Sequence, residues 1–195
     1  MTTLRSVLGA LSLAILLVPV AACGGPAAGP NAAATPTEVA TSAASACDAT
    51  AKMPDLGHDH INTLTHEYPQ HPATSGPHYP VWITPPPQVF STPLVEVRAV
   101  HNLEHGYVIV YYATGGEAAL PAPIVTALAA RVNGQAKVLM APYAAMPTGK
   151  SLAFAAWDEL QLCGPGVTAG DASAALAKFV AAFREGPLAP EPNAP

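Results

Sequence analysis

Residues 57–87 are the part of this chain that most limits how it can fold. They have the sequence GHDHINTLTHEYPQHPATSGPHYPVWITPPP and contain seven prolines, without the periodicity of a helix or a strand. Proline fixes φ and removes a backbone hydrogen-bond donor, so sequence of this kind forms loops. We therefore expect a long irregular segment that regular elements elsewhere in the chain must hold in place.

All seven histidines of the 195-residue chain lie between His58 and His105, and five of them fall in this proline-rich stretch. Histidine is the commonest metal ligand and the side chain whose unperturbed pKa lies nearest neutrality. Loops held by a rigid scaffold often carry binding residues. The clustering therefore predicts a site for metal or proton chemistry, without naming a substrate.

The N-terminal residues predict export. Arg5 precedes a weakly polar to apolar run, Val7–Val20, and the small residues after it end at Cys23. The run has 14 residues, against about 20 needed to cross a bilayer, which favours a signal peptide over a membrane anchor. Because VAAC (residues 20–23) resembles a lipobox, we expect residues 1–22 to be a lipoprotein signal peptide. Lipid on Cys23 would then attach the protein to the outer face of the cell membrane.

Two cysteines remain if Cys23 carries a lipid. Cys47 and Cys163 then form one pair in a compartment where disulfides persist, and we expect them to be bonded. The closed loop would have about 115 residues, which stabilises the fold by roughly 4 to 5 kcal/mol in the chain-entropy treatment. A two-thiolate metal site is the alternative, but neither cysteine has a histidine or cysteine at ligand spacing.

Charge and composition exclude two classes of partner and define the domain boundaries. The formal net charge is −5, and removal of residues 1–22 takes away one arginine and makes it −6. An acidic chain without a basic patch is not expected to bind nucleic acid, or to bind a membrane through polybasic contacts. Residues 23–46 are rich in Ala and Pro and predict a flexible tether; residues 187–195 predict a disordered tail. Residues 47–186 predict one globular domain.

The pattern of this domain predicts an α+β fold, with a small, mainly antiparallel sheet, two or more packed helices and the long Pro/His-rich loop region. Val95–Val100 and Gly106–Tyr112 are rich in β-branched and aromatic residues and predict an antiparallel pair of strands. The other predicted elements are a helix at Pro123–Asn133, strands at Ala136–Ala141 and Ser151–Trp157, and a helix over residues 171–185 with Asp171 as N-cap and Gly186 at its C-terminal end.

Several short strings together carry a family resemblance. TSGPH (Thr74–His78), HNLEHG (His101–Gly106), VLMAPYAAMP, AFAAWDEL and a helix ending near APEP resemble the domain-of-unknown-function 3105 family of exported bacterial proteins. The resemblance implies export and no established activity. This chain has Ala73 where relatives usually have a second proline before TSG. GHDH (residues 57–60) is not part of the pattern, so its two histidines are weaker candidates.

Three histidines are the predicted metal ligands. His101 and His105 are four residues apart, which places them on one side of a helix or a strand. His78 is the natural third ligand if the TSGPH loop folds over them. Ligating imidazoles are usually held through their second nitrogen, so we expect an orienting shell around them. The candidates for this shell are Glu104, Tyr68 and Ser75, and the weaker candidate ligands are His58, His60, His66, His71, Met140 and Met146.

The predicted metal is Zn or Cu, because three imidazoles suit both ions. Met140 and Met146 could add thioether ligands that favour Cu(I), although a methionine in the string VLMAP is more often part of a core. Ligands of one ion must lie close together. This prediction therefore requires the imidazoles of His78 and His101 to lie within about 3 to 5 Å of each other.

Other functions stay open at this point. The histidines could hydrogen-bond loop carbonyls in an envelope interaction protein or structural protein that binds no metal. HNLEH also fits the HxxEH pattern of metal-dependent peptidases, with Glu104 as general base, although these need a substantial helix and a further acidic ligand. A hydrolase triad on Ser75 lacks the Gly-x-Ser-x-Gly turn. We therefore expect a binding protein rather than an enzyme.

Overall fold

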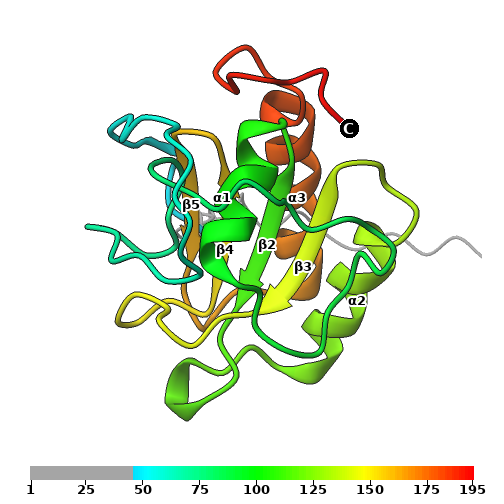
Figure 1. The fold of residues 1–195 in the computed structure, drawn as a ribbon. Coiled ribbons are helices and arrows are strands. Elements are labelled where there is room, and N and C mark those ends of the chain that lie inside the picture. Colours follow the sequence, from blue (N-terminus) through cyan, green and yellow to red (C-terminus); the bar gives the residue numbers. More distant parts are fainter. Residues whose placement is uncertain (1–45) are drawn as a thin grey trace, which may run out of the picture. The chain divides into compact units, whose positions relative to one another are not determined.

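A five-stranded sheet carries three α-helices and the long loop segment (Figure 1), which confirms the predicted α+β fold. The structure, a computed structural model, describes residues 46–195. The predicted signal peptide, Cys23 and residues 23–45 of the predicted tether lie outside these residues. Nowhere in the described part does a helix combine the length and the apolar character needed to cross a membrane. The elements are β1 (Ala51–Lys52), α1 (Glu96–Glu104), β2 (Val108–Tyr112), the 3₁₀ turn η1 (Gly116–Ala118), α2 (Ala122–Val132), β3 (Val138–Pro142), β4 (Leu152–Ala156), β5 (Glu159–Cys163) and α3 (Ala169–Phe183).

The strands lie in the order β1-β5-β4-β2-β3. Only the β2–β3 pair is parallel among the described strands, and α2 makes the crossover that a parallel pair requires. Val110 pairs with Met140 on one side and Phe154 on the other. Because β2, β3 and β4 are covered on both faces, their sequences VIVYY, VLMAP and LAFAA are almost continuously apolar.

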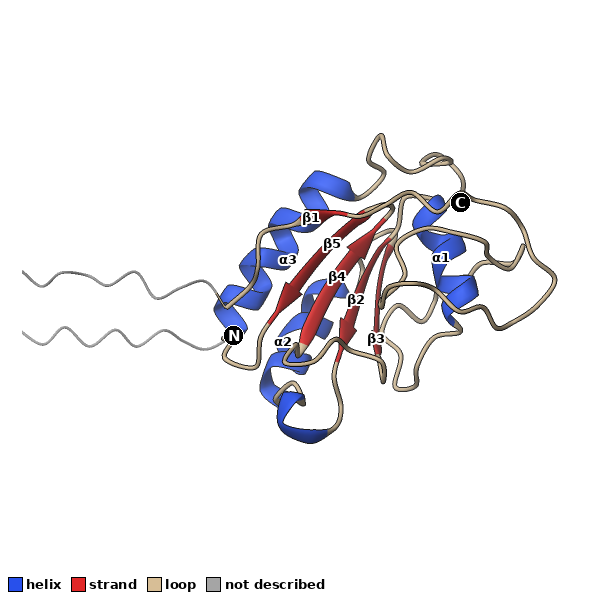
Figure 2. Cartoon of the chain, turned by 90° about the vertical axis from the view of Figure 1, so that its left-hand side faces the viewer, coloured by secondary structure: helices blue, strands red, loops and turns tan. Residues whose placement is uncertain are grey.

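Successive residues of each strand face opposite sides of the sheet, and the two sides have separate cores. Val108 and Val110 belong to the core under α2 and α3, whereas Ile109 and Tyr111 belong to the core under α1. Figure 2 shows the layers directly, with α2 and α3 on one side of the sheet and α1 on the other. The proline-rich loops pack on the α1 side, since Tyr68 and its neighbours are part of that core.

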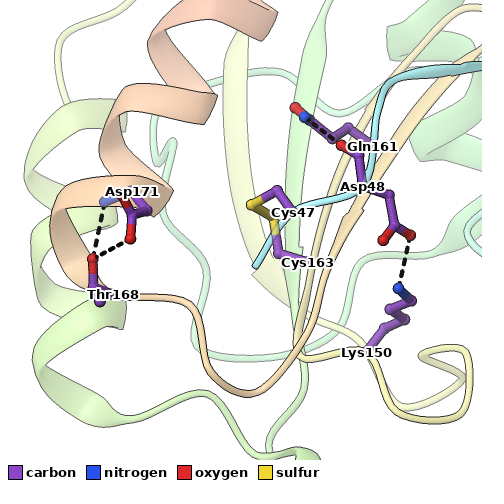
Figure 3. The surroundings of a disulfide bond; sticks show 7 residues. All are labelled: Cys47, Asp48, Lys150, Gln161, Cys163, Thr168 and Asp171. Carbon is purple, nitrogen blue, oxygen red and sulfur yellow. Dashed lines mark hydrogen bonds and ion pairs between the residues drawn. A yellow bond between two sulfur atoms is a disulfide. The ribbon is translucent and has the colours of Figure 1, made fainter. Parts of the chain in front are cut away.

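Helix α3 covers the core on the side of the sheet that it shares with α2. It begins after Thr168, whose side chain accepts a hydrogen bond from the backbone N–H of Asp171 at 3.1 Å (Figure 3). The N-cap is therefore Thr168 and not Asp171, the cap that the sequence predicted. Asp171 lies three residues further along the helix, where its carboxylate accepts a hydrogen bond from the Thr168 hydroxyl at 2.7 Å. Phe179 packs on Phe154 of β4 with ring centroids 5.9 Å apart.

The predicted pairing of Cys47 with Cys163 is present as a disulfide across 116 residues of sequence. It ties the segment before β1 to the end of β5 (Figure 3). Two polar contacts support the same junction: Lys150 pairs with the Asp48 carboxylate at 2.7 Å, and the Gln161 amide donates to the Asp48 carbonyl at 2.9 Å. The N-terminal edge of the domain is therefore fixed covalently and by hydrogen bonds.

One predicted strand is wrong: Val95–Val100 runs into helix α1 instead. Seven of the nine residues of α1 are buried, and three of these seven, His101, Asn102 and Glu104, are polar. Polar residues therefore interrupt the apolar periodicity from which a helix is recognised in a sequence.

Residues 187–195, whose composition predicts a disordered tail, pack against the end of α1. The Glu191 N–H donates to the Glu104 carbonyl at 3.0 Å, and the Lys137 ammonium donates to the Pro192 carbonyl at 2.7 Å. Gly106 allows this approach. A Cβ at this glycine would lie 2.9 Å from Glu185 Cα, and its φ of +77° also favours glycine.

Candidate metal centre

The last turn of α1 carries three of the polar side chains that form the site. His101 and Glu104 belong to the helix, and His105 is its C-cap. All three are buried. The one-turn spacing of the two histidines places their Nε2 atoms 3.1 Å apart.

Two loops bring further histidines onto this turn. The backbone around His60 pairs with the backbone around His78: Ile61 N–H donates to His78 O at 2.8 Å, and His78 N–H donates to Asp59 O at 2.9 Å. The Tyr79 N–H then donates to the Val97 carbonyl at 3.1 Å, which joins the loop to α1.

Tyr68 and Ser75, the predicted orienting residues, hold the loops rather than the imidazoles. The Tyr68 hydroxyl donates to Pro77 O at 2.7 Å. The Ser75 hydroxyl accepts from Leu56 N–H at 3.1 Å and donates to Pro54 O at 3.3 Å. Ser75 therefore joins the TSGPH loop to the backbone of residues 54–56.

The Glu104 carboxylate lies at the centre of the histidines. Its Oε2 atom is 3.0 Å from His78 Nε2 and 3.8 Å from His101 Nε2, and its Oε1 atom is 3.2 Å from His58 Nδ1. The Glu104 side chain is only 4% exposed, whereas that of His58 is 66% exposed. A buried carboxylate is costly without positive partners, so this position favours a cation or protonated imidazoles beside it.

Three imidazoles are oriented by backbone oxygens. Nδ1 donates to Gly76 O in His78 (2.9 Å), to Tyr79 O in His101 (2.8 Å) and to Pro195 O in His105 (2.9 Å). A backbone oxygen can only accept, so Nδ1 carries the hydrogen in each ring. In the neutral imidazole the lone pair is then on Nε2, which is the nitrogen that points into the site.

His101 is favoured in this neutral state. Burial lowers the pKa of its imidazole below the ordinary value, and the charges of His78 and His105 lower it further. The hydrogen bond to the Tyr79 carbonyl and the charge of Glu104 act in the opposite direction and are outweighed. His101 therefore presents an Nε2 lone pair at neutral pH.

The ligand atoms that come together differ in part from the predicted set. The atoms of His60, His78, His101 and Glu104 lie within 4.8 Å of one another. The ring centroids of His78 and His101 are 4.8 Å apart, which meets the condition set by the sequence prediction. His105 is grouped instead with Glu104 and Glu191, and His60, a weaker candidate, takes its place in the first group.

Aromatic rings line the site. Trp82 lies over His105 and His101, with centroid distances of 4.9 and 5.6 Å. The Trp157 ring stands edge-on to His78 at 6.3 Å. These walls lower the local dielectric, which strengthens an interaction between Glu104 and a bound cation.

The other candidate residues lie elsewhere. His66 contacts the Tyr68 ring at 4.7 Å. Met140 belongs to the core under α2 and α3, and the sheet separates it from the histidines; Met146 packs on the α1 side and lines a pocket with Tyr143. Met140 therefore lies on the opposite side of the sheet from the histidines, whereas a thioether contribution from Met146 stays a prediction.

His71 belongs to a second polar cluster at the start of α1. Its Nδ1 atom is 2.9 Å from the Tyr143 hydroxyl, which donates to the Glu96 carboxylate. Burial and this hydrogen bond raise the pKa of Tyr143 well above its usual range. The Ala73 N–H also donates to Glu96, at 3.0 Å. This cluster therefore anchors the loop before TSGPH.

Sequence reasoning missed the places of His60 and Glu191. His60 joins the site through loop pairing between residues 57–61 and 76–78, which is a tertiary contact. Glu191 lies in a proline-rich stretch that predicts a tail. Glu191 is the one charged residue of that stretch, and this is the signal that could have drawn attention to it.

Comparison with known proteins agrees with the motif resemblance. No curated protein and no solved structure matches the chain. The family described as "Protein of unknown function (DUF3105)" matches residues 60–195, a span that begins at His60 and includes the whole of α1 and the C-terminal segment. The chain belongs to this DUF3105 family.

Proposed function

We propose that this protein is a lipid-anchored, extracytoplasmic binding protein that holds a transition metal ion, zinc or copper(II), between the TSGPH loop and α1. The observation that carries the proposal is the arrangement of nitrogens: Nδ1 of both His78 and His101 is used by a backbone oxygen, and both Nε2 atoms face the buried Glu104 carboxylate. This is the outer-shell geometry that metal-binding histidines use.

The distances suit an ion after small shifts. Ligands at about 2.0 to 2.2 Å from a tetrahedral ion lie about 3.3 Å from one another. The Glu104 Oε2 atom is 3.0 Å from His78 Nε2 and 3.8 Å from His101 Nε2, on either side of that value. His60 supplies a further imidazole from the solvent side, since it is exposed. Nitrogen and oxygen donors without sulfur favour Zn or Cu(II).

A purely structural role explains only part of the geometry. Hydrogen bonds from Nδ1 to loop oxygens would stabilise the loops in a protein that binds no metal. They do not involve the Nε2 atoms, which lie 3.1 Å apart in His101 and His105 beside the buried Glu104 carboxylate. A bound cation would use these nitrogens as ligands.

Elemental analysis of the purified full-length chain tests the proposal. After incubation with Zn(II) or Cu(II) and gel filtration, the wild-type protein should retain at least one ion per chain, with Cu(II) bound more tightly than Zn(II). His101→Ala should lose this ion, while His66→Ala, at an exposed histidine in the same loop region, should keep it. A wild-type chain that retains neither metal would leave the interaction protein as the better explanation.

The HxxEH peptidase remains as a second candidate because His101 and His105 do share one side of a helix. The two functions assign different roles to Glu104. A general base can be replaced by Gln with loss of hydrolysis and retention of metal, whereas a ligand cannot. We expect Glu104→Gln to weaken metal binding.

Attachment to the membrane through Cys23 is part of the proposal. The VAAC string and the Cys47–Cys163 disulfide, a bond that persists in oxidising compartments, support it. Cys23→Ser should move the protein from the membrane fraction to the soluble fraction after export. A variant that stays in the membrane fraction would contradict the lipid anchor.

A further inference from the structure

Glu104 belongs to two groups of possible ligands. One group contains His60, His78 and His101, the other contains His105 and Glu191, and within each group the ligand atoms lie within 4.8 Å of one another. We propose that the Glu104 carboxylate bridges two divalent metal ions, the second of which is held by His105 and Glu191. This inference rests on the metal binding proposed above and adds a second site to it.

The surroundings of the His105 imidazole point to the second ion. His105 is 3% exposed, and its Nδ1 hydrogen goes to Pro195 O. Its Nε2 atom lies 3.1 Å from His101 Nε2 and 3.5 Å from Glu191 Oε2. Imidazole nitrogens and a carboxylate oxygen thus converge at a point that is buried on the His105 side, and both kinds of atom are ligands of divalent transition metals.

Glu191 is held at this point by its backbone. Its N–H donates to the carbonyl of Glu104 itself, at 3.0 Å. The Lys137 ammonium joins the two sides, donating to His105 O at 3.1 Å and to Pro192 O at 2.7 Å. The Glu191 side chain is 60% exposed, so an ion can reach it from solvent. The second site is thus fixed on one side and accessible on the other.

The spacing and donors define the kind of ion. Carboxylate-bridged ions in two-metal sites lie about 3.5 to 4 Å apart, so ligands of neighbouring ions can come within about 3 Å of each other. The His101–His105 Nε2 distance of 3.1 Å is of this kind. One imidazole and two carboxylates suit a divalent ion such as Zn(II) or Cu(II) and leave room for water as a further ligand.

Counting ions in matched variants of the full-length chain tests the bridge. After loading with Zn(II) and gel filtration, the wild-type chain should hold two ions and Glu191→Gln one. Glu185→Gln, the same change at a glutamate just before this segment, should hold two. Because Glu191 is exposed, its substitution does not threaten the fold, and circular dichroism checks this. One ion in the wild type, or two in Glu191→Gln, overturns the second site, whereas no ion in any protein overturns the proposed function itself.

Electron paramagnetic resonance of the Cu(II)-loaded chain tests whether the two ions lie close to each other. Two Cu(II) ions bridged by Glu104 should give a coupled spectrum with a half-field transition, and Glu191→Gln should give the spectrum of an isolated Cu(II). Two ions per chain with an uncoupled spectrum would place the second ion elsewhere and contradict the bridge.

Discussion

The two faces of the sheet bury different chemistry. Under α2 and α3, Val110, Phe154 and Phe179 belong to a core that is almost wholly apolar. On the α1 side, the buried residues include His78 and Glu104 together with other polar side chains. Burial of apolar surface stabilises a fold, whereas burial of polar groups is costly unless they are paired. Both faces bury an apolar core, and the comparison indicates that the α1 side holds a polar site in addition.

The largest effect should come from the apolar face. Phe179→Ala removes a buried ring that packs on Phe154 and should lower the free energy of unfolding by about 3 to 5 kcal/mol, as measured by urea denaturation. Lys178→Ala, at the exposed neighbour, should change it by less than about 0.5 kcal/mol. Metal retention below the denaturation range should be unchanged in both, and its loss in Phe179→Ala would break the separation of the two faces.

Removal of the disulfide should have the next largest effect. Cys47→Ser combined with Cys163→Ser opens a loop of 116 residues and should lower the free energy of unfolding by about 2 to 5 kcal/mol. The bond lies in the core of the apolar face, so the number of bound ions should stay the same once the variant is folded. Thermal unfolding followed by circular dichroism, with ion counting at low temperature, measures both quantities.

Metal binding on the α1 side should change the free energy of unfolding by a smaller amount than the two preceding substitutions. Zn(II) at one hundred times its dissociation constant should raise the free energy of unfolding by about 2.7 kcal/mol, because it binds the folded chain alone. Chelation should remove this gain, and Glu104→Gln should show little of it. A metal-dependent stabilisation of equal size in Glu104→Gln would show that the ion binds away from this carboxylate.

The smallest effect at neutral pH concerns the buried tyrosines of the α1 side. Burial raises the pKa of Tyr111 and Tyr143 above the ordinary value, so the folded chain keeps both neutral. The unfolded chain ionises them near pH 10, so their contribution to stability is complete below that pH. Above it, the contribution decreases by up to about 1.4 kcal/mol per pH unit for each tyrosine. Tyrosinate absorbance from these residues should therefore appear together with alkaline unfolding, and Tyr143→Phe should unfold at higher pH.

The same comparison explains what the sequence could predict. The helix over residues 171–185 and the Pro123–Asn133 helix were accessible because their apolar residues recur with helical spacing, and α3 and α2 confirm them. The prediction of a strand at Val95–Val100 failed because the buried residues of α1 include the polar His101 and Glu104. A polar site interrupts the hydrophobic pattern from which helices are recognised, so the element that carries the site was the least predictable one.

The candidate site was predictable in part for a related reason. His78, His101 and Glu104 lie within the two motifs and do come together. His60 and Glu191 depend on contacts between distant segments, which no local pattern encodes. Met140 is not available to the site because of its position along β3: its neighbour Leu139 faces the α1 side and Met140 faces away.

The disulfide also determines what happens when the chain is cut. Cys47 and Cys163 make the intervening residues a covalent ring, and all seven histidines lie within it. A protease that cuts once in the exposed loop around Leu64 opens this ring but releases no fragment. The two pieces stay together through the sulfur bond, so the histidines of the loop and those of α1 remain parts of one molecule after the cut.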